Sequence, residues 1–180
     1  MEYFEENWDG REFPLAYLIT IRTYGTWLHG DERSSVDTHD EYNIVGSERR
    51  VPDRRLEEIM RRNQLGDAMI FNDEQREVVE NAIREVCLHR EYRLHTQNVR
   101  TNHAHVVVGA QALPELIANS FKSYSTRALK SHGLIAPDAK VWSRGRSRRY
   151  LWKPRHLEGA IDYVTYGQGL MPFEKWYEEY

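Results

Sequence analysis

A helical pattern followed at once by two strand patterns constrains the fold of this chain more than any other feature. Residues 72–92, NDEQREVVENAIREVCLHREY, open with the capping residue Asn72, carry acidic residues in the first turn and repeat apolar residues at helical spacing. Two segments rich in strand-forming residues follow, at 92–100 and 102–110. A long helix beside two consecutive strands predicts an α+β fold.

The other segments complete an alternating order of strands and helices. A first strand is predicted at residues 15–25, a second helix at 113–133, a basic hairpin at 140–152 and a last helix at 155–167. This order is typical of a ferredoxin-like, or RRM-like, sandwich, in which helices cover one face of an antiparallel sheet. We therefore expect that sandwich, with a further helix at its C-terminal end.

Length and composition favour one domain in a reducing compartment. The chain has 180 residues, 40% of them hydrophobic, so it can bury a hydrophobic core, and residues 1–180 are predicted to form one compact domain. Residues 26–70 are rich in turn formers and charges, and we interpret them as an insertion with one short helix. Cys87, the only cysteine, lies in a helical pattern and is predicted to be a buried hydrophobe. Neither a signal peptide nor a membrane span is indicated, so a cytoplasmic protein without membrane contact is expected.

Charge is distributed unevenly along the sequence. The whole chain has a net charge of −3, but residues 98–157 carry eleven Lys and Arg against two acidic residues. Residues 140–155, KVWSRGRSRRYLWKPR, contain seven basic residues, no acidic residue and three interleaved aromatics. Basic groups neutralise phosphates and aromatic faces stack on unpaired bases, so this composition suits single-stranded nucleic acid. A solvated basic hairpin whose aromatics pack inward is the alternative.

Two histidines share one face of the strand predicted at residues 102–110. Side chains two positions apart in a strand point to the same side, so His103 and His105 point together while Ala104 and Val106 point to the other side. Two neutral imidazoles so close can bind one divalent ion and leave coordination positions open for other ligands. Two histidines exposed on the open face of a sheet are the alternative.

Three segments of the chain together resemble a known family. They are YLITIRTYGTWLHGDER in the first strand, TNHAHVVV with its two histidines, and AIDYVTYGQG near the end. In this order they resemble the single-tyrosine HUH transposases, the insertion-sequence-200-like group that includes relatives associated with repetitive extragenic palindromes. The resemblance implies a metal-dependent endonuclease and strand transferase, which cuts single-stranded DNA at hairpin-bearing sites through a 5′-phosphotyrosine intermediate. It also implies a homodimer that is associated with the nucleoid when bound to DNA.

The resemblance also implies roles for individual residues. The metal-binding histidines of the family fall on His103 and His105, and its nucleophile falls on Tyr163. The family commonly supplies a third ligand, Gln or Asn, four residues after that tyrosine, but this chain has Gly167 there. Either a left-handed Gly167 directs Gln168 back toward the ion, or the third ligand is missing.

The nucleophile and the metal stay open at this point. Tyr166 lies three residues after Tyr163, on roughly the same helix face, and is the second candidate for the nucleophile. Two imidazoles with oxygen ligands suit Mg²⁺ or Mn²⁺, which the resemblance implies, whereas imidazoles alone also tolerate zinc or nickel.

Basic and aromatic residues outside this site are predicted to contact DNA. Basic side chains would meet the phosphate backbone, and tryptophans would stack on bases. A solvated surface position is the alternative for the basic residues, and core packing is the alternative for the tryptophans. The predicted DNA-binding residues are Arg22, Lys122, Arg127, Arg144, Arg146, Arg148, Arg149, Trp142 and Trp152.

Three functions from different classes are consistent with these features. The first is the nuclease and strand transferase described above. The second is a DNA-hairpin-binding protein of the same fold that lost catalysis, which Gly167 at the expected ligand position favours. The third is a metal-dependent phosphodiesterase that uses the histidines but no tyrosine.

Overall fold

The computed structural model describes residues 12–26, 53–62 and 66–167. The strands form one sheet in the order β2-β3-β1-β4, and every neighbouring pair is antiparallel. The predicted α+β fold with an antiparallel sheet is therefore confirmed. The elements are β1 (Ala16–Arg22), α1 (Arg54–Arg62), α2 (Asp73–His89), β2 (Arg93–Val99), β3 (His103–Gly109), α3 (Pro114–Ser131), β4 (Ser147–Leu151) and α4 (Pro154–Tyr166).

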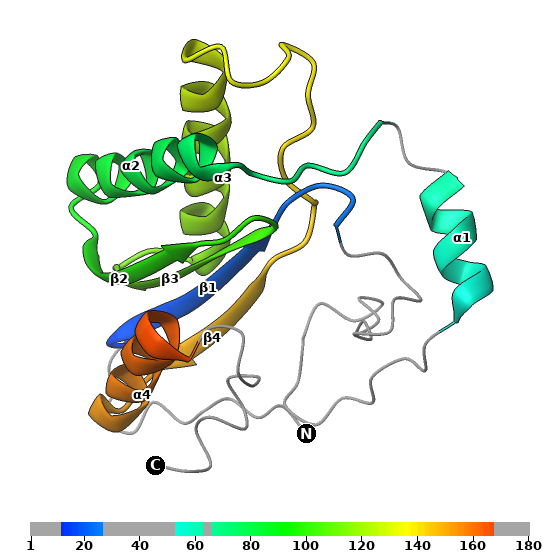
Figure 1. The fold of residues 1–180 in the computed structure, drawn as a ribbon. Coiled ribbons are helices and arrows are strands. Elements are labelled where there is room, and N and C mark those ends of the chain that lie inside the picture. Colours follow the sequence, from blue (N-terminus) through cyan, green and yellow to red (C-terminus); the bar gives the residue numbers. More distant parts are fainter. Residues whose placement is uncertain (1–11, 27–52, 63–65, 168–180) are drawn as a thin grey trace.

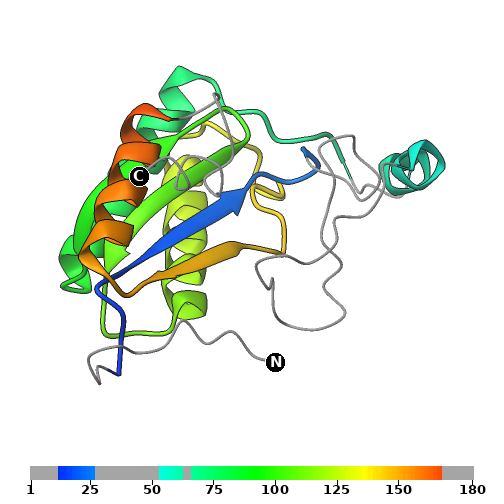
Figure 2. The same cartoon turned by 90° about the horizontal axis from the view of Figure 1, so that it is seen from below.

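Helices cover both faces of the sheet. α2 and α3 lie together on one face, and α4 lies on the other (Figure 1). In the view from below, α4 is in front of the sheet and α3 is behind it (Figure 2). The sheet thus separates the predicted tyrosine helix from the two helices that complete the sandwich.

Alternate residues of β1 contribute to two separate cores. Tyr17, Ile19 and Ile21 are buried in the core beneath α2 and α3. Ala16 and Leu18 are buried in the core beneath α4. Because a shift of one residue would exchange these two sets, burial on both faces fixes the register of this strand. The same alternation decides which side chains of β3 and β4 can meet α4.

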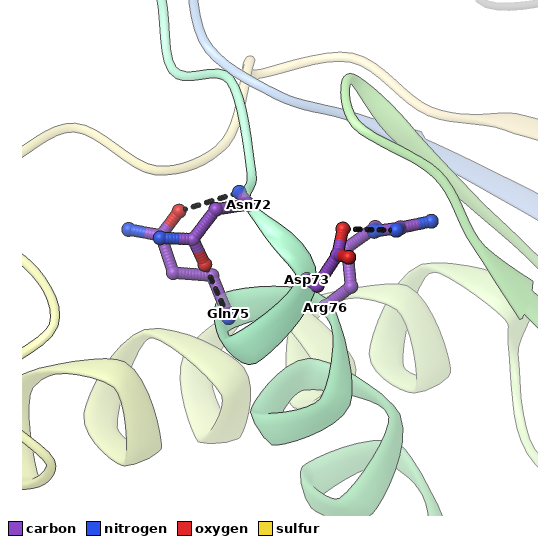
Figure 3. Close-up of polar contacts among 4 residues, drawn as sticks. All are labelled: Asn72, Asp73, Gln75 and Arg76. Atoms are coloured by element: carbon purple, nitrogen blue, oxygen red, sulfur yellow. Dashed lines mark hydrogen bonds and ion pairs between the residues drawn. The ribbon is translucent and has the colours of Figure 1, made fainter.

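The strongest helix begins where the sequence predicts. The side chain of Asn72 accepts a hydrogen bond from the backbone N–H of Gln75 at 2.8 Å, and the side chain of Gln75 accepts one from the backbone N–H of Asn72 at 2.9 Å (Figure 3). This reciprocal capping box uses two backbone donors that the first turn of a helix leaves unpaired. Asp73 and Arg76 add an ion pair beside it (Figure 3).

The basic hairpin predicted at residues 140–152 is wrong. Ser147–Leu151 pairs antiparallel with β1, and Trp142 forms an isolated antiparallel bridge to Thr23, just beyond the end of β1. Trp142 and β4 therefore lie along the same side of β1 and run in the same direction. The residues between them form a bulge and do not reverse the chain. The Nζ of Lys122 on α3 fills this bulge and donates hydrogen bonds to the carbonyls of Ser143, Arg144 and Gly145.

Most of the predicted insertion at residues 26–70 lies outside the described residues. α1 confirms the short helix expected there, and Asp53 accepts a hydrogen bond from the backbone N–H of Arg55 at its start. The limits of the insertion stay a prediction. Within the described ranges, no helix combines the length and the apolar character that a bilayer crossing needs.

Candidate active site

The two histidines of β3 face α4 from the sheet. His103 and His105 lie on the same side of the strand, and their ring centroids are 4.7 Å apart. Ala104 and Val106 point to the opposite side, into the core beneath α2 and α3. The common face predicted for the two imidazoles is therefore confirmed.

Hydrogen bonds to neighbouring side chains hold both imidazole rings. The Nδ1 of His103 lies 2.7 Å from Oδ1 of Asn102. Because an amide oxygen only accepts, this Nδ1 carries the proton and the ring lone pair is on Nε2. The Nδ1 of His105 lies 2.7 Å from Oγ1 of Thr20, its register partner on β1. A hydroxyl oxygen can accept in the same way, so both rings are suited to bind a ligand through Nε2.

His105 is neutral at physiological pH. Burial, followed by the nearby positive charges of His103, Arg22 and Arg100, lowers the pKa of His105 to about 3. An unperturbed histidine titrates at about 6.5, so the ring stays deprotonated in the neutral range. Neutral imidazole is the form that binds a metal ion, and the surrounding arginines favour an anionic ligand such as phosphate.

Tyr163 comes to the histidines from α4. Its ring is edge-on to the ring of His105, with the centroids 5.7 Å apart and the planes at 75°. The side chain is only 8% exposed and belongs to the core beneath α4. Tyr166, one turn further along the same helix, is 72% exposed. Of these two tyrosines on α4, the one with a described ring contact to the histidine pair is Tyr163.

The end of α4 differs from the expected left-handed turn. Gly167 is the C-cap residue, with φ −84° and ψ −2°, and its backbone N–H donates to the carbonyl of Tyr163 at 2.9 Å. This right-handed conformation continues the helical hydrogen bonding by one residue. Of the two alternatives for this position, the left-handed Gly167 is excluded, because the glycine completes the last turn. Gln168 lies outside the described residues, so its role as a ligand stays a prediction.

The donor set suits a divalent ion only in part. Two imidazoles with their Nδ1 atoms engaged could supply two nitrogen ligands to an ion. Within the described ranges, no group of three or more His, Cys, Asp or Glu could enclose a metal ion. An ion held by His103 and His105 would thus keep several coordination positions for oxygen ligands, as Mg²⁺ and Mn²⁺ do.

The sheet divides the predicted DNA-binding arginines between its two faces. Arg146 and Arg148 pair with Glu115 of α3, at 3.0 and 3.1 Å. Arg149 follows Arg148 in β4 and therefore points to the opposite face, where its register partner Leu18 packs against α4. The basic cluster is continuous in sequence, but only part of it lies on the face of the histidines.

Arg22 lies on the histidine face as well. It is the last residue of β1 and the register partner of His103. Directly opposed residues of antiparallel strands share a face, so the two side chains leave the sheet at neighbouring positions. Arg22 and Arg149 are the two predicted DNA-binding residues that β1 and β4 place on this face.

Three other predicted contacts lie away from that face or on the exposed surface. Lys122 is bound by three carbonyls of the bulge, and burial, then the charge of Arg146, lowers its pKa to about 8. The guanidinium of Arg127 lies over the ring of Tyr124, 5.1 Å from its centroid. Arg144 is exposed in the bulge. Their contacts with DNA stay predictions.

The two tryptophans proposed for base stacking are both half-buried. Trp142 lies edge-on to Phe71 at 5.4 Å, and its buried Nε1 has no hydrogen-bond partner among the described residues. Trp152 is stacked on Tyr150, with the centroids 6.3 Å apart and the planes at 9°. Trp142 therefore packs against the core beneath α2 and α3, and Trp152, just beyond the end of β4, forms a stacked pair with Tyr150.

Sequence reasoning missed three polar residues next to the histidines. Thr20 and Asn102 bond the imidazole rings, and Asn98 of β2 is the register partner of His105. Thr20 interrupts the apolar run of β1, and that interruption was a usable signal. Asn102 directly precedes His103, so its place in the sequence was a usable signal as well, whereas Asn98 carried none, because only the strand pairing brings it to the site.

Comparison with known proteins identifies the family of the chain. Residues 66–157, just over half of the chain, match the family described as Transposase IS200 like; the match includes both histidines and ends before Tyr163. A crystal structure from Deinococcus radiodurans R1, assigned as a transposase, is 14% identical with a TM-score of 0.47, covering 88% of this chain and 94% of that one. A REP-associated tyrosine transposase bound to a REP hairpin is 12% identical with a TM-score of 0.46, covering 88% and 82%. No curated protein sequence matches the chain. The extent of the family match shows that the chain belongs to the IS200-like transposases, as its sequence predicts.

Proposed function

We propose that this chain nicks single-stranded DNA at hairpin-bearing sites and rejoins it, with Tyr163 as the nucleophile and a divalent metal ion as cofactor. Membership of a transposase family supports DNA cleavage as the activity. The observation that carries the assignment of residues is the contact between the rings of Tyr163 and His105, at 5.7 Å. It joins the candidate nucleophile and the candidate metal ligands within one chain.

The proposed reaction exchanges one phosphodiester for another. The phenol oxygen of Tyr163 attacks the phosphorus and loses its proton, while the bond from phosphorus to the 3′ oxygen breaks. The 5′ phosphate stays on the tyrosine, and the departing 3′ oxygen takes up a proton as a free hydroxyl. Because the covalent link conserves the bond energy, a 3′ hydroxyl from another DNA end can reverse the step without ATP.

The residues around the tyrosine have complementary tasks in this proposal. His103 and His105 would hold the ion, and Thr20 orients the ring of His105 through Nδ1. A bound Mg²⁺ or Mn²⁺ would offset the charge that builds on the nonbridging oxygens of the phosphate. Arg22 and Arg149 bind the DNA backbone on the same face of the sheet.

Tyr163 is preferred to Tyr166 because of position. A nucleophile has to reach a phosphate that lies next to the histidines, and reacting atoms need to approach to about 3–3.5 Å. Tyr163 is in ring contact with His105, while Tyr166 is 72% exposed. Binding of DNA hairpins and formation of a homodimer are proposed from the family resemblance alone.

A covalent adduct tests the proposal directly. The probe is a single-stranded oligonucleotide library with one fixed hairpin, randomised flanks and a 3′ label, incubated with the full chain and Mn²⁺. Cleavage as proposed transfers the label to the protein and shifts it on a denaturing gel. Tyr163→Phe should give no shifted band, whereas the matched variant Tyr166→Phe should give one, and EDTA should abolish it. An adduct that survives in Tyr163→Phe would show that the assigned nucleophile is wrong.

A second function is favoured by one observation. Gly167 stands where the family commonly has its third metal ligand, and it has no side chain to offer. A DNA-hairpin-binding protein without nuclease activity would bind the same library tightly yet form no adduct with Mg²⁺ or Mn²⁺. Hydrolysis of a small phosphodiester by Tyr163→Phe would instead support the metal-dependent phosphodiesterase.

A further inference from the structure

We infer that Asn98 is a positioning residue, which fixes the end of α4 on the sheet and thereby holds Tyr163 against His105. The inference rests on the proposed function for the roles of Tyr163 and His105. It adds a third residue, which acts through the position of Tyr163. Neither the resemblance nor the sequence pattern assigns it a role.

Asn98 connects the two halves of the site. It is the register partner of His105 on the neighbouring strand, so the two side chains share one face of the sheet. Its Nδ2 donates a hydrogen bond of 3.2 Å to the carbonyl of Val164, the residue that follows Tyr163. One side chain therefore lies beside the histidine and bonds the backbone next to the tyrosine.

The end of α4 needs such a contact. Val164 is in the last turn of the helix, where backbone carbonyls run out of donors from within the helix. Thr165 and Tyr166, which follow it, are exposed and so bury little apolar surface on the sheet. The side chains of Thr96 and Thr165 make a second, longer polar contact at 3.3 Å, on the exposed rim. The amide of Asn98 is the partly buried polar anchor between this turn and β2.

The neighbouring residue offers a matched control. Gln97 points to the opposite face of β2, and its Nε2 donates a hydrogen bond of 3.0 Å to the carbonyl of Glu80 on α2. Asn98 and Gln97 thus make the same kind of bond, from adjacent positions of one strand to carbonyls of two different helices. If Asn98 acts on the site, its loss will move Tyr163, and the loss of Gln97 will leave Tyr163 in place.

The test measures the position of the tyrosine without relying on activity. Asn98→Leu removes the donor at similar volume, and Asn98→Asp removes it at nearly identical shape, while Gln97→Met is the control. In full-length protein with labelled Tyr and His, the nuclear Overhauser effect between the Tyr163 and His105 rings should be present in the parent and in Gln97→Met. It should weaken in both Asn98 variants. Amide exchange at residues 164–167 should become about fivefold faster in these two variants, as expected for one lost hydrogen bond.

Activity then separates this inference from the proposed function. If both hold, Asn98→Leu, which leaves the charge of this face unchanged, binds the hairpin library with parental affinity but forms the adduct more slowly. Unchanged ring contact and unchanged exchange in both Asn98 variants would overturn the positioning role. Loss of the ring contact in a protein that forms no adduct even as the parent would leave the positioning role intact and reject the nuclease.

Discussion

The hydroxyl of Thr20 lies 2.7 Å from Nδ1 of His105, across the central strand pair of the sheet. This contact gives the half-buried hydroxyl of Thr20 a polar partner in a mostly apolar strand. The bond fixes the orientation of the ring and, with Nδ1 protonated, directs the lone pair of Nε2 to the open side. In the proposed metal site, such a bond would orient His105 as a ligand.

Replacing Thr20 by Val should weaken Mn²⁺ binding by about 10- to 100-fold, because the shape is kept and the bond to His105 is lost. Titration followed by the electron paramagnetic resonance of free Mn²⁺ measures this. Thr20→Ser keeps the hydroxyl and should stay within a few-fold of the parent. Equal affinity in Thr20→Val and Thr20→Ser would show that the bond does not orient a ligand.

Arg149 and Arg148 are adjacent, but their replacement should affect the binding of single-stranded DNA differently. Arg149→Gln should weaken binding of single-stranded DNA and reduce the slope of log K against log salt by about 0.7, the amount expected for one phosphate contact. Arg148→Gln removes an ion pair with Glu115 on the far face and should leave that slope unchanged. Fluorescence anisotropy at several salt concentrations measures both slopes. A larger change in Arg148→Gln would place the DNA on the face of α3.

Lys122 should contribute more to the stability of the fold than to DNA binding. Its Nζ donates to the carbonyls of Ser143 and Gly145 at 2.8 Å and to that of Arg144 at 3.3 Å. Lys122→Met leaves these carbonyls without their donor and should lower the free energy of unfolding by about 1–3 kcal/mol. Urea denaturation measures the loss. Arg127→Met on the exposed side of α3 is the control, and an equal loss there would contradict a specific role for Lys122.

Cys87 should be unreactive in the folded protein. It is 3% exposed, and burial raises the pKa of its thiol to about 11, so little thiolate is present at pH 8. We expect its reaction with a disulfide reagent to be at least about tenfold slower than that of an exposed thiol. The comparison is a variant with Cys87→Ala and Leu88→Cys, since Leu88 is 81% exposed on the same helix. Comparable rates would mean that α2 opens readily.

Several elements followed from local sequence because their determinants are local. Asn72 and Gln75 cap α2 within four residues of each other, and the apolar spacing that follows defines the buried face. The alternation around His103 and His105 placed both imidazoles on one face, because side chains of a strand alternate whatever the rest of the sheet does. These features required no knowledge of distant segments.

The errors arose where distant segments decide the outcome. The basic segment around Trp142 looked like a hairpin, but β1 and Thr23 offer both of its halves a partner, so neither half pairs with the other. For Gly167 the left-handed turn was one of two alternatives, and there the contact is local, because its backbone N–H donates to the carbonyl of Tyr163 and the glycine stays right-handed. Neither outcome can be predicted from the local sequence pattern.

The amino-acid sequence was sufficient to predict the family, the helices and strands except the hairpin, and the two-sided pattern of the histidine strand. The ring contact of Tyr163, rather than Tyr166, with His105 became visible in the folded chain, as did the placement of Arg149 on their face and of Arg148 on the other. The physical reason is that helical and strand periods are set by neighbours in sequence, whereas the meeting of two side chains depends on the register of paired strands and on the packing of a helix across them.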